Sequence, residues 1–276
     1  MTSRIDQRFA ALKAEGRAGL VAYVMAFDPD LETSLEIIKA LPAAGADVIE
    51  VGFPFSDPMA EGPSIQKAAE RGLKAGGSLK GTLDLVARFR EADQTTPVIL
   101  MGYANPVEHM GAEAFATRAK TAGADGVILV DLPPEEDLET RSALGGQGLS
   151  LIRLATPTTD AARLPVVLEG VTGFLYYVSV TGVTGARAIG VDAARAAVER
   201  LKRSTDLPIA VGFGVRDAQS ASAVARAADA VVVGSAFVDV IAKAAADGAP
   251  VVEAVSAKVS ELARAVRTAR EQDKTA

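Results

Sequence analysis

The chain has 276 residues, 49% hydrophobic and 23% charged, a balance typical of a soluble globular protein with a core large enough for one α/β barrel or two small domains. A net charge of −6 argues against nucleic-acid binding, which needs a concentrated positive surface. The absence of cysteine excludes disulfides, thiolate nucleophiles and cysteine–zinc sites, and it fits a reducing compartment. The polar N-terminus lacks a signal-peptide core and no apolar run reaches the length of a membrane span, so we expect a cytoplasmic protein.

The first predicted element is an amphipathic helix from Ser3 to Glu15, which Ser3 can cap. An apolar run of strand length follows, from Gly19 to Phe27. A helical pattern at 31–41 and a second strand at 47–52 come next, and a helix-competent segment begins at Ser64. The chain therefore starts as a helix followed by strand–helix units.

The alternation of apolar strands with helical patterns continues to the end of the chain. Six further strands are predicted at 97–101, 126–130, 149–154, 174–178, 208–211 and 230–233. Helices are predicted at 111–122, 135–144, 160–168, 191–203, 217–227, 236–246 and 251–270.

Eight strands that are apolar on both faces predict a parallel sheet covered by helices. The alternative to a closed barrel is an open doubly wound sheet, which predicts a glycine-rich motif after the first strand, but residues 23–30 contain no glycine. We therefore expect the α/β class, as a single (β/α)8 TIM barrel domain over residues 1–276. An extra N-terminal helix, an extra short helix after the eighth strand and a frayed tail at 271–276 complete the prediction.

Two carboxylates flank a proline-stiffened loop after the second strand. Glu50 lies within the otherwise apolar strand, and Glu61 follows eleven residues later. An ionisable group in such a strand is costly unless it is paired or used, so the two are a candidate acid/base pair.

Glycines end the seventh and eighth strands, at Gly212–Gly214 and at Gly234-Ser235, and a helix starts at Ala236. In a (β/α)8 barrel the active site lies at the carboxyl ends of the strands, and these two loops usually bind phosphate. Because neither motif contains lysine or arginine, backbone N–H groups would hold the anion. The alternative is that the glycines only make tight turns.

The residue types that are missing from the strand ends argue against several kinds of reaction. No lysine lies at a strand end, which disfavours a Schiff-base aldolase. The only histidine, His109, is expected in a solvated loop, and with no cysteine a metal site is improbable. Carboxylate acid/base catalysis on a small phosphorylated substrate remains, with three tyrosines as polar or stacking partners: Tyr23, Tyr103 and Tyr176.

The segment Pro54–Gln66, PFSDPMAEGPSIQ, resembles the most specific motif of the tryptophan synthase α subunit family, the indole-3-glycerol-phosphate lyases. Five more motifs follow in that family's order, at 103–106, 131–133, 179–185, 212–214 and 234–235. The resemblance covers essentially the whole chain. It implies a retro-aldol cleavage of indole-3-glycerol phosphate to indole and glyceraldehyde 3-phosphate, in the last stage of tryptophan biosynthesis.

The resemblance also implies roles for individual residues. Glu50 would act at the indole C3 and at the side-chain hydroxyl, Glu61 would serve the indole N–H, and Tyr176 would join them in the catalytic set. Indole-binding residues would be Tyr23, Met101, Ile128, Val130, Leu154 and Phe213, and phosphate-binding residues Gly185, Gly214, Gly234 and Ser235. The alternative is that the large apolar side chains are plain barrel core.

A partner follows from the same resemblance. The family works as an αββα tetramer, in which indole passes to a β subunit that holds pyridoxal phosphate. Asp57, Pro58, Thr184 and the loop after Asn105 would form the partner-facing loops. The chain itself is expected to need neither cofactor nor metal.

Some positions depart from the family's pattern. Many members have aspartate where this chain has Glu61, glycine where it has Phe27, and an apolar residue where it has Arg153; some have arginine where it has Val180. The residues support two other hypotheses less well. A phosphate-binding barrel isomerase or transferase gives no reason for the carboxylate pair, and the intact pair argues against a non-catalytic, partner-activating subunit.

Overall fold

The computed structural model describes residues 2–178, 191–212 and 214–271. These residues form one sheet of nine parallel strands, in the order β5-β4-β3-β2-β1-β9-β8-β7-β6. The strands are β1 (Gly19–Met25), β2 (Val48–Gly52), β3 (Val98–Gly102), β4 (Gly126–Leu129), β5 (Ser150–Leu151), β6 (Leu154–Ala155), β7 (Leu175–Val178), β8 (Ile209–Gly212) and β9 (Ala230–Val233).

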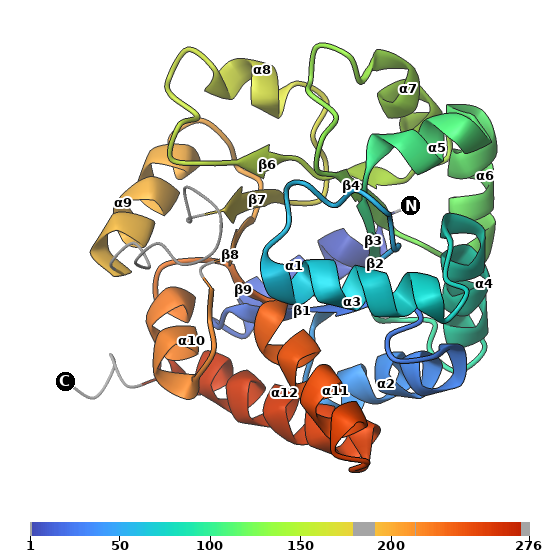
Figure 1. Ribbon diagram of the computed structural model, residues 1–276. Helices are drawn as coiled ribbons and strands as arrows, with labels where there is room; N and C mark the ends of the chain where they lie inside the picture. Colours follow the sequence, from blue (N-terminus) through green and yellow to red (C-terminus); the bar gives the residue numbers. More distant parts are fainter. Residues whose placement is uncertain (1, 179–190, 213, 272–276) are drawn as a thin grey trace.

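The two edges of the sheet, β5 and β6, are consecutive in the chain, so the sheet closes into a barrel. β5 pairs with β4, and β6 pairs with β7. The single fifth strand predicted at 149–154 is therefore two short strands, because the chain changes its pairing partner within it. The predicted (β/α)8 barrel is confirmed, with helices surrounding the strands (Figure 1).

Arg153 lies at this change of partner, and its guanidinium is buried. It pairs with the buried carboxylate of Asp137 and donates hydrogen bonds to the carbonyls of Val167 (2.8 Å) and Glu169 (2.6 Å). These partners explain why Arg153 can occupy an apolar strand position, because groups outside the barrel accept the hydrogen bonds of its guanidinium.

The helices of the described residues are α1 (Arg4–Ala14), α2 (Leu31–Ala44), α3 (Pro63–Lys74), α4 (Leu79–Arg90), α5 (Ala104–Met110), α6 (Ala112–Ala122), α7 (Leu138–Gly146), α8 (Leu164–Leu168), α9 (Val191–Lys202), α10 (Ala218–Ala225), α11 (Ser235–Ala246) and α12 (Val251–Thr268). The extra N-terminal helix and the extra helix after the last strand are confirmed as α1 and α11. Two helices, α4 and α5, have no counterpart in the sequence prediction.

The loop predicted around His109 is wrong, because this residue lies exposed on α5. The turn signal at Asn105-Pro106 is the start of the helix. Pro106 is in the first turn, where a missing N–H leaves no intrahelical hydrogen bond unmade.

Helix α1 fills the N-terminal end of the barrel. Ser3 caps it in a capping box with Asp6, as the sequence indicated. Ile5, Phe9 and Leu12 are buried against the inward side chains of the strands, and the Phe9 and Phe174 rings lie 5.6 Å apart. Figure 1 shows α1 lying across this end of the ring, so that an open site can form only at the opposite end.

Phe27 has a φ of 66° in the turn after β1, which explains why glycine suits this position. Its ring is buried against the start of α4, where a Cβ on Gly81 would lie 2.6 Å from it. The turn goes on to Asp28, a fully buried carboxylate that accepts two hydrogen bonds from Arg71 of α3, at 2.7 and 2.8 Å. This ion pair fixes α3 over the end of β1.

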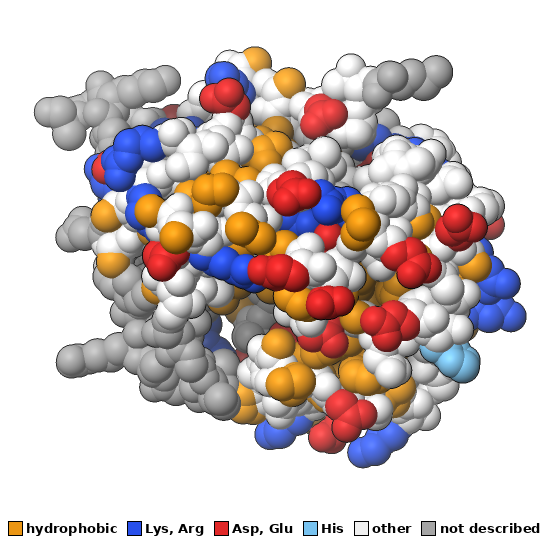
Figure 2. Space-filling view, turned by 90° about the horizontal axis from the view of Figure 1, so that it is seen from above, with side chains coloured by type: hydrophobic (Ala, Val, Ile, Leu, Met, Phe, Trp, Pro, Cys, Tyr) orange, Lys and Arg blue, Asp and Glu red, His pale blue; other side chains and the backbone are white. Residues whose placement is uncertain are grey.

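Acidic and basic side chains are interspersed on the face shown in Figure 2, where positive charge forms no continuous patch. Within the described ranges no helix is both long enough and apolar enough to cross a membrane. The predicted frayed tail, 271–276, lies outside the described residues except for residue 271.

Candidate active site

A cavity of about 450 Å³ lies at the carboxyl ends of the strands, the position expected for this architecture. Strands β1, β2, β3, β7, β8 and β9, the loop before α3 and the first turns of α3 and α11 all contribute to its wall. Its polar side chains are Tyr23, Glu50, Glu61, Tyr176 and Ser235.

Glu50 points into the cavity from the middle of β2 and is fully buried. Neither of its carboxylate oxygens has a hydrogen-bond partner among the described residues. Burial, and to a lesser extent the charge of Glu61, raises the pKa of Glu50 to about 8. Near neutral pH this carboxyl group is therefore largely protonated and can act as an acid.

Glu61 stands half-buried at the mouth of the cavity, at the end of the loop between β2 and α3. Its N–H donates to the carbonyl of Pro58 (3.1 Å), and its own carbonyl accepts from the Gln66 side chain (2.9 Å). Burial raises the pKa of Glu61 to about 7. At neutral pH a substantial fraction of this group is ionised and can accept a hydrogen bond.

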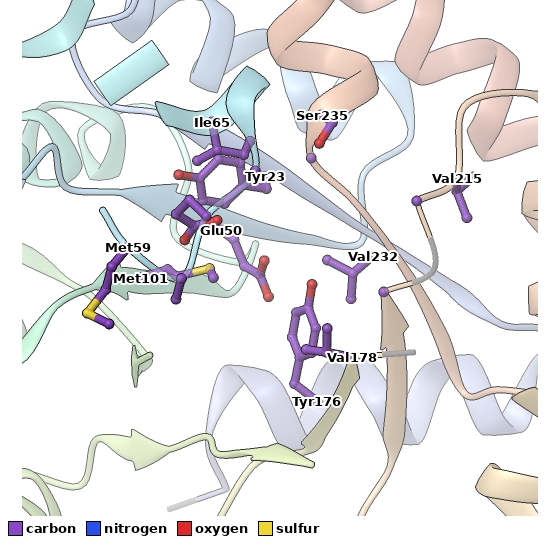
Figure 3. Close-up of a pocket in the computed structure, with 16 residues that line it drawn as sticks. Tyr23, Glu50, Met59, Ile65, Met101, Tyr176, Val178, Val215, Val232 and Ser235 are labelled. Carbon is purple, nitrogen blue, oxygen red and sulfur yellow. The ribbon is translucent and has the colours of Figure 1, made fainter. Parts of the chain in front are cut away.

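Two tyrosines enter the cavity, the buried Tyr23 from β1 and the partly buried Tyr176 from β7. Burial, followed by the charges of Glu50 and Glu61, raises the pKa of both Tyr23 and Tyr176 well above the usual value, so both hydroxyls stay protonated. Figure 3 shows the Glu50 carboxyl and the Tyr176 hydroxyl pointing toward each other.

Glycines on the neighbouring strands make room for these rings. A Cβ on Gly52 would lie 2.2 Å from the Tyr23 hydroxyl, and one on Gly212 would lie 2.5 Å from that of Tyr176. The positions of both phenols therefore depend on the absence of a side chain next to them.

The opposite wall suits an anion. Gly214, Gly234 and Ser235 line it, and Gly234 begins α11 without any side-chain cap. Among the described residues, the first N–H groups of this twelve-residue helix therefore lie at the cavity wall without a side-chain partner. No lysine or arginine of the described residues lines the cavity.

The structure brings together nine of the residues named from the sequence. They are Tyr23, Glu50, Glu61, Met101, Tyr176, Gly212, Gly214, Gly234 and Ser235. Ile128 is fully buried in the barrel interior with the side chains of α1, and Leu154 and Val130 pack against that cluster, so none of the three lines the cavity.

Asp57 and Pro58, which were predicted to face a partner, lie on the loop before Glu61, outside the cavity lining. Phe213, Thr184 and Gly185 lie outside the described residues. The sequence reading missed Met59, Ile65 and Val232. Val232 had a signal, since it lies two residues after the buried, inward Ala230 and so on the same face of a strand that ends at the site.

Among the described residues, no group of three or more histidine, aspartate or glutamate side chains is placed to hold a metal ion.

Residues 9–267 match the family model described as tryptophan synthase alpha chain. The tryptophan synthase alpha chain of Caulobacter vibrioides is 62% identical over 267 residues, and that of Phenylobacterium zucineum is 58% identical over 268, with 97% of both chains covered in each case. Among solved structures, tryptophan synthase subunit alpha from Legionella pneumophila superposes with a TM-score of 0.91 at 40% identity, over 96% of this chain and 99% of that one. Tryptophan synthase of Mycobacterium tuberculosis gives a TM-score of 0.88 at 36% identity, covering 97% and 99%.

Proposed function

The chain belongs to the tryptophan synthase alpha chain family, and on that premise we propose that Glu50 and Glu61 carry out its cleavage of indole-3-glycerol phosphate to indole and glyceraldehyde 3-phosphate. The reaction makes the chain a carbon–carbon lyase of tryptophan biosynthesis. The observation that carries the residue assignment is the pair of carboxyl groups with raised pKa values, about 8 and about 7, on one cavity.

In the first step the protonated Glu50 donates its proton to C3 of the indole ring. The ring loses its aromaticity and gains positive charge at N1, which the ionised Glu61 stabilises by accepting the N–H hydrogen bond. Glu50 begins this step as a carboxylic acid because burial raises its pKa to about 8.

In the second step Glu50, now a carboxylate, takes the proton of the hydroxyl on the carbon attached to C3. The carbonyl of glyceraldehyde 3-phosphate forms, the carbon–carbon bond breaks, and its electron pair restores the aromatic indole. Glu50 ends in its starting protonation state, and the proton that it first gave remains on C3. General acid–base catalysis of this kind contributes about 10²- to 10⁴-fold in rate.

The remaining walls bind and orient the substrate. Tyr23, Ile65 and Met101 flank the indole, and the Tyr176 hydroxyl, which faces Glu50, donates to the reacting side chain. The N–H groups at Gly234 and Ser235, which no side chain of the described residues caps, hold the phosphate. Phe213 and Gly185 complete the indole and phosphate sites in this proposal by their motif positions.

The chain pairs with the β subunit of tryptophan synthase, to which the indole passes, and the family's pyridoxal phosphate belongs to that subunit. For the contact we propose Asp57, Pro58 and Thr184; the neighbouring Met59 is 84% exposed. We also propose that residues 1–276 form one domain and that the protein acts in the cytoplasm.

The test is indole formation by the Glu50→Gln variant, with and without a β subunit. We expect turnover to fall at least 10³-fold while a phosphorylated indole ligand still binds, since glutamine keeps the shape but cannot give and take the proton. Glu139→Gln, an exposed glutamate on α7, is the matched control and should retain full activity. Unchanged turnover in Glu50→Gln would refute the assignment and favour a different barrel reaction. A wild-type chain that forms no indole even with its partner would indicate the non-catalytic subunit.

A further inference from the structure

Within the part of the chain that the structure describes, the loop that carries Glu61 has few hydrogen bonds to the rest of the barrel. Its first residue, Phe53, still donates to the carbonyl of Met101, as a continuation of the sheet. Two later bonds close the loop on itself, from Met59 N–H to Asp57 (2.8 Å) and from Glu61 N–H to Pro58 (3.1 Å). The Gln66 side chain of α3 also donates to the Glu61 carbonyl (2.9 Å), which ties the end of the loop to its own helix. None of these later bonds joins the loop to a neighbouring strand.

A side chain from the neighbouring strand supplies such a link. Tyr103 follows β3 as the cap residue of α5 and is only 3% exposed. Its hydroxyl accepts the N–H of Ala60 at 3.0 Å, one residue before Glu61. Its ring stacks on Phe55, near the start of the loop, with the centroids 5.3 Å apart. One side chain thus holds both ends of the loop.

Tyr103 contacts the residue before Glu61 but does not line the cavity. Ala60 and Glu61, in contrast, both belong to the cavity lining. Burial, followed by the Glu61 carboxylate, raises the pKa of Tyr103, so the hydroxyl stays protonated. While it accepts from Ala60, it therefore still has a proton to donate to an acceptor nearby.

We propose that Tyr103 is a positioning residue for Glu61, because its hydroxyl fixes the peptide before Glu61 and its ring fixes Phe55. The inference rests on the proposed role of Glu61 toward the indole N–H. When the hydrogen bond at Ala60 holds the backbone in place, the Glu61 carboxylate can accept the indole N–H at a fixed distance and angle. Small misplacements of a catalytic group cost up to about 10²-fold in rate.

Tyr103→Phe separates the two contacts, since it removes the hydrogen bond and keeps the ring stack. The test measures ligand affinity, because variants of catalytic residues turn over too slowly for their rates to be compared. The probes are a phosphorylated 3-alkylindole without the reactive hydroxyl and its N-methyl analogue, titrated into the full-length chain by calorimetry. The ratio of their affinities reports the hydrogen bond from the indole N–H to Glu61.

In the wild type we expect the N–H ligand to bind about 10- to 100-fold more tightly, as a hydrogen bond to a charged group would give. Tyr103→Phe should reduce this ratio about 3- to 10-fold and lower turnover by a similar factor. In a Glu61→Ala background the same substitution should change the ratio by less than about twofold. Tyr177→Phe, which removes a buried hydroxyl that faces away from the cavity, is the control and should leave the ratio unchanged.

The outcomes separate the two claims. If Tyr103→Phe leaves the ratio unchanged, or lowers it equally with and without Glu61, Tyr103 does not position that carboxylate. If Glu61→Ala itself keeps the wild-type ratio and turnover, the proposed role of Glu61 fails instead. A lower melting temperature without a change in ratio would indicate a purely structural tyrosine and would also overturn the inference.

Discussion

Tyr23 and Glu50 are register partners on β1 and β2, so both side chains enter the same cavity from neighbouring strands. In a parallel pair, register partners point to the same side of the sheet. The barrel therefore places a phenol that stays neutral beside a carboxyl group that keeps its proton near pH 7.

The pH dependence of kcat/KM for indole formation should be a narrow bell. Activity needs ionised Glu61, so it falls as the pH drops through about 7, and it needs protonated Glu50, so it falls as the pH rises through about 8. A pH series of steady-state rates measures both limbs. Glu61→Gln should remove the acidic limb from the residual activity. A flat profile between about pH 6 and pH 9 would contradict these roles.

Glu50→Gln should stabilise the fold at alkaline pH. The folded-state pKa of Glu50 is raised from 4.5 to about 8, so its contribution to stability is complete below about pH 4.5 and is lost as the pH rises to about 8. The loss is at most about 1.4 kcal/mol per pH unit in that window. Glutamine has no proton to lose. Urea unfolding of both proteins should give similar stabilities near pH 4 and a growing advantage for Glu50→Gln up to pH 8; equal stabilities throughout would exclude the burial effect.

Gly52→Ala should displace Tyr23. The new Cβ would lie 2.2 Å from the Tyr23 hydroxyl, so the ring must move away from the indole position. We expect a loss of about 1–3 kcal/mol in stability and a KM raised about tenfold. The control is Gly146→Ala at the end of α7, where a Cβ meets nothing within 4 Å; it should be neutral or stabilising by up to about 1 kcal/mol. Similar effects of the two substitutions would show that the contact with Tyr23 does not matter.

At Phe27 glycine should be better than alanine. Both replacements lose the buried ring, but alanine also keeps a Cβ at a φ of 66°, which costs about 1–2 kcal/mol. Phe27→Gly should therefore be more stable than Phe27→Ala by about 1 kcal/mol in thermal unfolding. At Phe115, a fully buried residue within α6, the order should reverse, since glycine is unfavourable in a helix. The same order at both positions would contradict the backbone explanation.

Much of the fold could be predicted because it rests on local patterns. Apolar runs alternating with helical periodicity indicated the strands, and their number indicated the closed barrel. Local patterns were weakest where a tertiary partner decides the structure. The fifth strand splits because the chain changes pairing partner near Arg153, whose ionic partner Asp137 lies sixteen residues away.

The candidate site was also partly predictable from local sequence patterns. Glu50 could be found because a carboxylate within an apolar strand is costly, and the phosphate wall because glycines end two strands. Ile128 was named for the indole site but lies deeper, although its register partner Met101 lines the cavity. The strands of a barrel tilt against its axis, so register partners lie at different depths along that axis. The sequence pattern of a single strand does not show how deep each inward residue lies.

The sequence by itself determined the barrel, the carboxylate pair and the order of the motifs, because burial periodicity and turn residues act locally. Only the tertiary structure decided that Glu50 is without a hydrogen-bond partner among the described residues, and that Tyr103 holds the loop before Glu61. A pKa depends on how much water and charge surround a group, and a tether depends on which side chains meet across strands. Both arise when β2, β3 and their loops come together in the closed ring.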